Sequence, residues 1–77
     1  MVELTKYIVE QLVDDKSAID ITSSVDEAGM ETISIRVAEG DIGKVIGKQG
    51  KIAMSIRTLA KAVGIREGKK YNIEIQD

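Results

Sequence analysis

The residues of this sequence best suited to chemistry are two glycines, Gly47 and Gly50, which flank Lys48 and Gln49. Because glycine lacks a Cβ, the bulky backbone of a ligand can approach the main chain closely at these positions. Gly50 also precedes a predicted helix, whose first N–H groups lack partners and, together with the helix dipole, favour an anion. The spacing therefore predicts a cradle for a phosphate group. The alternative is a plain turn between two helices, with lysines on its surface.

Lysines surround this segment, because Lys44, Lys48 and Lys51 all lie within a few residues of the two glycines. The arrangement is nevertheless not that of a nucleotide-hydrolysing P-loop. Residues 43–49 read Gly-x-x-x-Gly-Lys-Gln, whereas a P-loop has four residues between its glycines and a Ser or Thr after its lysine. The hydroxyl that would bind magnesium is missing, and the P-loop interpretation is rejected.

The residue types that are missing exclude several classes of protein. The 77 residues include no Cys and no His, so the sequence offers no disulfide, no thiolate, no zinc-thiolate site and no histidine base. Paired acidic residues at 14–15 and 26–27 lie in predicted turns, where solvated carboxylates are ordinary. We therefore expect a protein that is not an enzyme, with no catalytic residue, no metal site and no cofactor.

The sequence also lacks the patterns of membrane and secreted proteins. It has no run of about 18 apolar residues that could span a bilayer. Its first residues lack the basic and then apolar layout of a signal peptide. We expect a soluble, cytoplasmic protein with no membrane insertion.

The small net charge of −2 hides a separation of charge along the chain. Residues 1–43 carry ten acidic and three basic side chains, whereas residues 44–70 carry eight basic side chains and one acidic one. A basic half on an acidic protein is typical of a site for a polyanion. The alternative is a solvated dipolar surface without a ligand.

Hydrophobic periodicity predicts an N-terminal helix followed by a β-hairpin. The helix covers about residues 2–14. Alternating apolar and polar residues at 19–25 and at 33–37 predict two strands, and the polar, glycine-containing segment between them is short enough for an antiparallel hairpin. The residues expected on the buried faces of the helix and of the first strand are Leu4, Tyr7, Ile8, Leu12, Ile19, Ile21, Ser23 and Val25.

Two further helices and a last strand complete the pattern. Asp41 is expected to cap a short helix over residues 42–46. A long apolar stripe over residues 52–63 predicts the second helix, and Gly64 suits the left-handed position that ends it. Residues 71–75 alternate as a strand. The order α-β-β-α-α-β predicts an α+β fold of one domain over residues 1–77, with a three-stranded mixed sheet and the helices packed on one face.

With these elements in place, residues 45–56 resemble the signature of the KH domain, Val-Ile-Gly-x-x-Gly-x-x-Ile-x-x-Ile. The element order is similar to the type II, bacterial form of that domain. Residues 41–50 and 56–59 also resemble the small stand-alone bacterial KH proteins of the KhpA type. One departure from the signature is Ala53, which stands where Ile is usual and leaves the base preference open.

The resemblance implies single-stranded RNA binding by a post-transcriptional regulator or RNA chaperone, with the Gly-x-x-Gly loop clamping about four nucleotides by their backbone. Ile56 would lie in the floor of the apolar groove or in the core beneath it, as would Ile46 and Ala53. The alternative for these three residues is that they belong only to the hydrophobic core. The RNA-binding residues expected from the resemblance and from the charge pattern are Gly47, Lys48, Gln49, Gly50, Lys44, Lys51, Ile46, Ala53 and Arg57.

The sequence also bears on affinity and on partners. Its only aromatic residues are Tyr7 and Tyr71, both distant in sequence from the glycines, so one domain should bind RNA weakly, with no base stacking. The resemblance implies a homodimer and pairing with a larger KH-containing protein of the Jag type. The apolar residues expected to remain uncovered for a dimer are Val13, Met54 and Ile65. The alternative function is a protein-interaction or oligomerisation module on a KH fold, with little RNA binding of its own.

Overall fold

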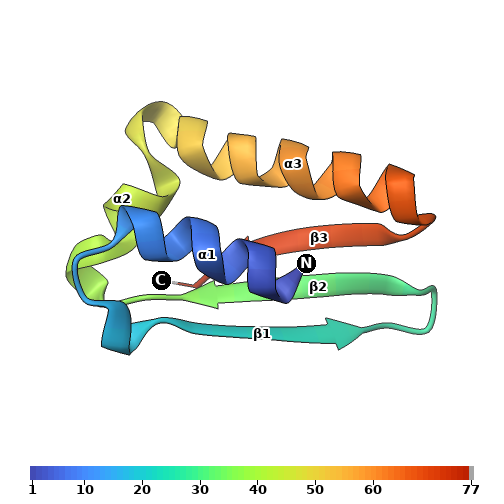
Figure 1. The fold of residues 1–77 in the computed structure, drawn as a ribbon, viewed down its shortest axis with the longest axis horizontal. Helices are drawn as coiled ribbons and strands as arrows, with labels where there is room; N and C mark the ends of the chain where they lie inside the picture. The colour runs from blue at the N-terminus through green and yellow to red at the C-terminus, as the bar shows by residue number, and fades with distance from the viewer. Residues whose placement is uncertain (77) are drawn as a thin grey trace.

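Three strands form one sheet, and the helices lie over a single face of it (Figure 1). The computed structural model describes residues 1–76. The predicted element order and the predicted α+β class are confirmed. The helices and strands are α1 (Val2–Leu12), β1 (Asp20–Val25), β2 (Met30–Arg36), α2 (Ile42–Ile46), α3 (Lys51–Glu67) and β3 (Lys70–Ile75), with short 3-10 turns at Lys16–Ala18, Glu39–Asp41 and Lys48–Gly50.

The sheet is mixed, as predicted. The central strand β2 pairs antiparallel with β1 and parallel with β3. Asp26 closes the hairpin between β1 and β2, because its carboxylate accepts the N–H groups of Ala28 and Met30 at 2.9 and 3.0 Å. Gly29, with φ +86°, supplies the left-handed backbone that this turn needs. The crossover through α2 and α3 then makes β3 parallel to β2.

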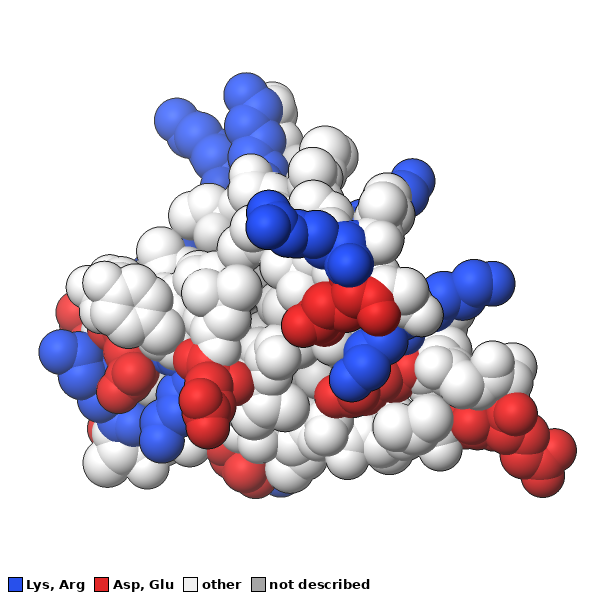
Figure 2. All heavy atoms as spheres, turned by 45° about the vertical axis from the view of Figure 1, so that its right-hand side comes forward, with Lys and Arg blue, Asp and Glu red and all other residues white. Residues whose placement is uncertain are grey.

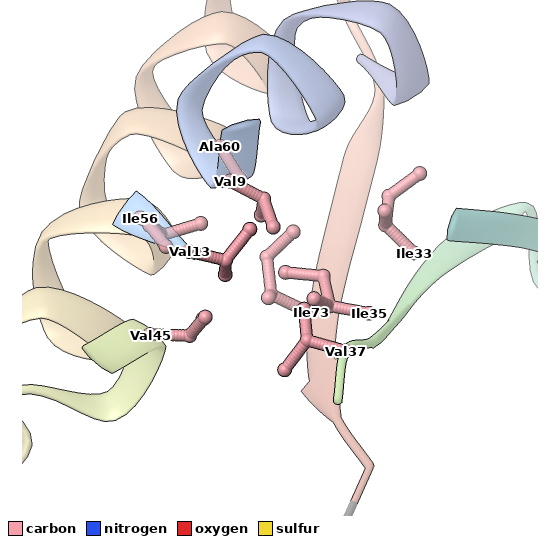
Figure 3. Close-up of a cluster of buried hydrophobic side chains, with 9 residues drawn as sticks. All are labelled: Val9, Val13, Ile33, Ile35, Val37, Val45, Ile56, Ala60 and Ile73. Carbon is pink, nitrogen blue, oxygen red and sulfur yellow. The ribbon is translucent and has the colours of Figure 1, made fainter. Parts of the chain in front are cut away.

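The core lies between the sheet and the helices, and Figure 3 shows its side chains pointing toward one another. It is thin and consists largely of β-branched side chains. Its members are Val9, Val13, Ile33, Ile35, Val37, Val45, Ile56, Ala60 and Ile73.

The apolar stripe predicted for the first helix is wrong in two of its four positions, since Leu4 and Tyr7 are exposed. The helix instead turns Thr5 and Val9 toward the sheet, and it ends at Leu12 rather than at about residue 14. Thr5 is a polar residue by type, and its hydroxyl is buried without a hydrogen-bond partner among the residues that the structure describes. A pattern of apolar residue types does not reveal this buried position, because Thr counts as polar.

Two further predictions of exposure are wrong. Val13, expected to be uncovered, is buried, because the chain leaves the helix there in an extended conformation and its side chain joins the core. Along β1, only Ile21 is half-buried, and Ser23 and Val25 are exposed rather than covered. Figure 1 shows the reason, since the hairpin end of β1 and β2 projects past the N-terminus of α1.

The end predicted for the long helix is also wrong. Gly64 does not stop α3, which continues to Glu67 and is capped by Gly68 in the left-handed conformation, with φ +70°. The carbonyl of Gly64 accepts the N–H groups of Gly68 and Lys69. Gly64 is buried inside the helix, where the chain leading into β3 passes so close that a Cβ would lie 2.6 Å from the carbonyl oxygen of Lys69. This glycine serves packing rather than termination.

Within the part of the chain that the structure describes, no helix combines the length and the apolar character needed to cross a membrane.

Candidate nucleic-acid interface

The Gly47–Gly50 loop joins α2 to α3 at one end of the molecule, above the edge of the sheet (Figure 1). Three of its four residues have positive φ: Gly47 (+78°), Gln49 (+57°) and Gly50 (+74°). The loop is a single 3-10 turn, closed by a hydrogen bond of 3.1 Å from the Gly50 N–H to the Gly47 carbonyl. Gly50 is the N-cap of α3 and supplies no side-chain cap. The first N–H groups of this helix are therefore left for a ligand or for water.

The two glycines of the loop are required for different reasons. A Cβ on Gly47 would lie 2.5 Å from Cγ1 and 2.9 Å from the backbone N of Ile52, so the loop folds directly onto α3 at this point. A Cβ on Gly50 would meet nothing within 4 Å, and only its positive φ disfavours a side chain. Gly47 fixes the shape of the loop, and Gly50 keeps its outer surface open.

Replacing Gly47 by Ala should therefore lower the free energy of unfolding by about 2 kcal/mol or more, because steric overlap adds to backbone strain. Gly50→Ala is the matched control and should cost only about 1 kcal/mol, from backbone strain alone. Urea denaturation of both variants measures the difference. Equal losses for the two variants would show that the contact with Ile52 relaxes without cost.

The predicted basic residues do not all gather at the loop. Lys48, Gln49 and Lys51 are exposed at the loop and at the start of α3. Lys44, in contrast, lies within α2 and is paired with the carboxylates of Asp14 and Asp41, the latter at 3.1 Å. These two hydrogen bonds, first of all the one with Asp14, raise the pKa of Lys44. The structure thus places Lys44 in a bridge between the segment after α1 and α2.

Asp41 anchors this bridge. It precedes α2 as predicted, but its side chain makes no capping hydrogen bond to the helix. The residue is only 4% exposed, and its carboxylate instead accepts hydrogen bonds from the backbone N–H of Asp15 at 3.0 Å and from the ammonium group of Lys44. The hydrogen bond from Asp15 is the main cause that holds the pKa of Asp41 below its usual range, and Lys44 adds to it. Asp41 thereby ties the helix that leads into the loop to the α1–β1 connection.

The lowered pKa of Asp41 predicts a dependence of stability on pH. The carboxylate is more acidic in the folded than in the unfolded chain, so its contribution is complete above the unfolded pKa of about 3.9 and is lost as the pH falls through the lower, folded value. We expect Asp41→Asn to be less stable than the parent at neutral pH, with the difference shrinking below about pH 4. Urea melts across this range measure it, with Glu39→Gln as an exposed control. A difference that does not change with pH would contradict this role.

The apolar residues predicted for a groove divide between two places. Ala53 and Ile56 are buried, and Ile56 belongs to the core cluster. Ile46 is half-buried beside the loop. Ile56 is therefore better described as a core residue than as part of a groove. Ala53 is small and faces inward at the start of α3.

Arg57 is exposed and lines a groove of about 450 Å³ that lies between α3 and β3. Three basic residues of this groove were not among the predicted site residues, although the basic segment 44–70 contains them. In Figure 2 the uppermost charged side chains, at the height of the loop and of α3 in Figure 1, are all basic. The residues that line the groove are Met30, Arg57, Lys61, Ile65, Lys69, Lys70, Tyr71, Asn72 and Ile73.

The chain is similar in sequence to known proteins over nearly its whole length. The family model described as KhpA/KhpB, KH domain, matches residues 2–75. The chain is 44% identical over 75 residues to the RNA-binding protein KhpA of Caldanaerobacter subterraneus. The alignment covers 97% of this chain and 99% of the relative. It is also 44% identical to the RNA-binding proteins KhpA of Treponema pallidum (97% and 92% covered) and Listeria monocytogenes (97% and 97%).

A solved structure shares the fold. A crystal structure of an Aquifex aeolicus Era variant, bound to GDP and aluminium fluoride, superposes on 96% of this chain with a TM-score of 0.59 and 21% sequence identity. The chain spans 28% of that Era chain. At this identity the likeness concerns the fold alone.

Proposed function

The chain belongs to the KhpA/KhpB family of KH domains, and from this we propose that it binds single-stranded RNA as a post-transcriptional regulator or RNA chaperone. The relatives are named RNA-binding proteins, and the family is not one of enzymes. Residues 1–77 would form a single KH domain. A cytoplasmic location belongs to the same proposal, because that is where bacterial transcripts are found.

One observation carries the proposal: the open Gly47–Gly50 loop at the start of α3. Its positive φ angles present the backbone N–H groups of the first helical turn without a capping side chain. Lys48, Gln49 and Lys51 stand exposed around it. Backbone donors, a helix N-terminus and lysines at one point suit a phosphate, and the basic groove beside α3 suits the strand that follows.

Filter binding with mixed cellular RNA at low and high salt tests the proposal. We expect binding at low salt that weakens as salt rises, with a logarithmic slope of about −0.7 for each phosphate contact on a single strand. Absence of binding at low salt would favour the protein-interaction module instead, in which the KH fold is kept and its surface serves oligomerisation.

We also propose a homodimer, because large apolar side chains remain exposed on the helical face. Met54 and Ile65 are 62% and 75% exposed on α3. Leu4, Tyr7 and Leu59 are exposed as well, and Leu59 borders a shallow apolar groove of about 190 Å³ with Ile8 and Leu12 of α1. Apolar surface of this kind is typical of interaction sites. A larger KH-containing protein of the Jag type is a second candidate for the same surface.

The dimer should appear in sedimentation as a species of about twice 8.4 kDa at micromolar concentration, in equilibrium with the monomer. Two copies would also raise RNA affinity through effective concentration. Analytical ultracentrifugation over a concentration series is the measurement. A single species of 8.4 kDa up to high concentration would exclude the homodimer.

A further inference from the structure

Tyr71 lies in the basic groove, although in sequence it is far from the glycine loop. It is half-buried on β3, on the same side of the strand as Ile73, and it lines the groove together with Arg57 and Lys61 of α3. The parallel pairing of β3 with β2 returns the chain beneath α3 and produces this placement. Tyr7, the other aromatic residue, is 61% exposed on α1 and lines none of this groove.

The ring of Tyr71 is held from two sides. The ring lies close to Gly64 of α3, where an added Cβ would be 3.3 Å from Cδ2 of the ring. Its hydroxyl donates a hydrogen bond of 2.6 Å to Oε1 of Glu67, one helical turn further along α3. This hydrogen bond, burial and the negative charges of Glu67 and Glu31 raise the pKa of Tyr71 to about 12. The side chain is therefore a neutral phenol with a fixed orientation at physiological pH.

The surroundings of the ring suit a nucleotide rather than a purely apolar ligand. Lys69 and Lys70, which directly precede Tyr71 in the chain, line the groove beside it, as do Arg57 and Lys61 of α3. Cations around an oriented aromatic ring can hold the phosphates of a single strand while the ring contacts a base, since every base has a π-face. The groove volume of about 450 Å³ is within the range of small-molecule sites, which begins at about 300 Å³.

We propose that Tyr71 stacks on one nucleobase of the bound strand, in the groove between α3 and β3, with Glu67 as the residue that positions its ring. The inference rests on the proposed RNA binding and deepens it, because it adds base stacking where the sequence predicts none. Tyr71 lies near the C-terminal end of α3, and the loop lies at its N-terminal end, about 25 Å away along a helix of 17 residues. A strand that reaches both sites is longer than the four or so nucleotides held by a Gly-x-x-Gly loop.

Tyrosine fluorescence tests the contact directly, because the chain has no Trp and only two Tyr. In a Tyr7→Phe variant Tyr71 is the sole tyrosine, and a single-stranded RNA of mixed sequence long enough to span α3 should quench its emission. In the matched Tyr71→Phe variant, which retains Tyr7, the same RNA should leave the emission unchanged.

The affinity of the variants for RNA is the second measurement. Tyr71→Leu should bind this RNA about tenfold more weakly, and Tyr71→Phe, which keeps the ring, should stay within a few fold of the parent. Tyr7→Leu is the control for loss of an aromatic elsewhere. If the parent binds RNA but Tyr71 is not quenched and Tyr71→Leu binds as the parent does, the stacking proposal is overturned and RNA binding stands. If the parent binds no RNA at all, the proposed function itself fails. If Tyr71→Leu folds poorly, the fluorescence measurement alone still tests the stacking proposal, because it does not use that variant.

Discussion

Changing Lys48 and Gln49 together to Asp will reduce RNA binding by at least about tenfold, while the melting temperature stays nearly unchanged. Both side chains are exposed in the loop, so two carboxylates there would face the phosphates that the loop is proposed to hold. Each charge contact at close range is worth about 1 kcal/mol or more. Exposed substitutions away from packed features usually change stability by only about 0.5 kcal/mol. Filter binding and thermal melts followed by circular dichroism measure the two effects.

A control variant must change the net charge by the same amount as the double Asp variant at Lys48 and Gln49. Gln11→Asp with Lys16→Asp does so at exposed positions of α1 and of the segment that follows it. This control should bind RNA within a few fold of the parent, because its charges lie away from the loop. A Lys51→Ala variant should lose less affinity than the double Asp variant and should flatten the salt dependence by one contact. If the double Asp variant binds as the parent does, the clamp does not lie at this loop.

A loss of stability comparable to that of Gly47→Ala is expected from Gly64→Ala. The added Cβ would lie 2.6 Å from the carbonyl oxygen of Lys69, a backbone atom that cannot move without displacing β3. Overpacking of this kind costs about 1–3 kcal/mol or more and outweighs the gain of about 1 kcal/mol that Ala brings to a helix. We expect a net loss of about 2 kcal/mol, which is large for a chain whose total stability is about 4–12 kcal/mol.

Two other glycines separate the effect of packing from that of backbone conformation. Gly68 has φ +70° but open space around a Cβ, so Gly68→Ala should cost about 1 kcal/mol. Gly40 has open space and an ordinary φ, so Gly40→Ala should change stability little. Urea denaturation ranks the three variants. A Gly64→Ala variant as stable as Gly40→Ala would show that β3 shifts freely under α3.

Much of the site follows from local sequence, because the loop is a local structure. The positive φ angles of Gly47 and Gly50 are backbone states that glycine adopts most readily, and their spacing marks a turn between helices. The exposed positions of Lys48 and Gln49 follow from the same turn. The order of helices and strands is equally local, since a periodicity of 3.6 or of 2 residues is visible within one segment.

Which side chains pair across the fold is determined by the tertiary structure and not by the local sequence. Lys44 is near the glycines in sequence, yet its ammonium group pairs with Asp14, thirty positions away. Asp41 has the residue type of a helix cap but accepts the N–H of Asp15 instead. A carboxylate binds whichever donors the packed chain brings to it, and nothing in residues 41–44 shows which segment will arrive there.

The sequence by itself determined the order of the elements, the glycine loop at the start of α3 and the concentration of positive charge in residues 44–70, because each depends on residues near one another in the chain. The tertiary structure alone decided that Gly64 is a packing glycine, that Thr5 rather than Leu4 faces the sheet, and that Tyr71 stands among the lysines of a groove. These outcomes depend on how closely α1 and β3 approach their neighbours. That distance is set by side chains from several segments at once, and so it cannot be read from any one of them.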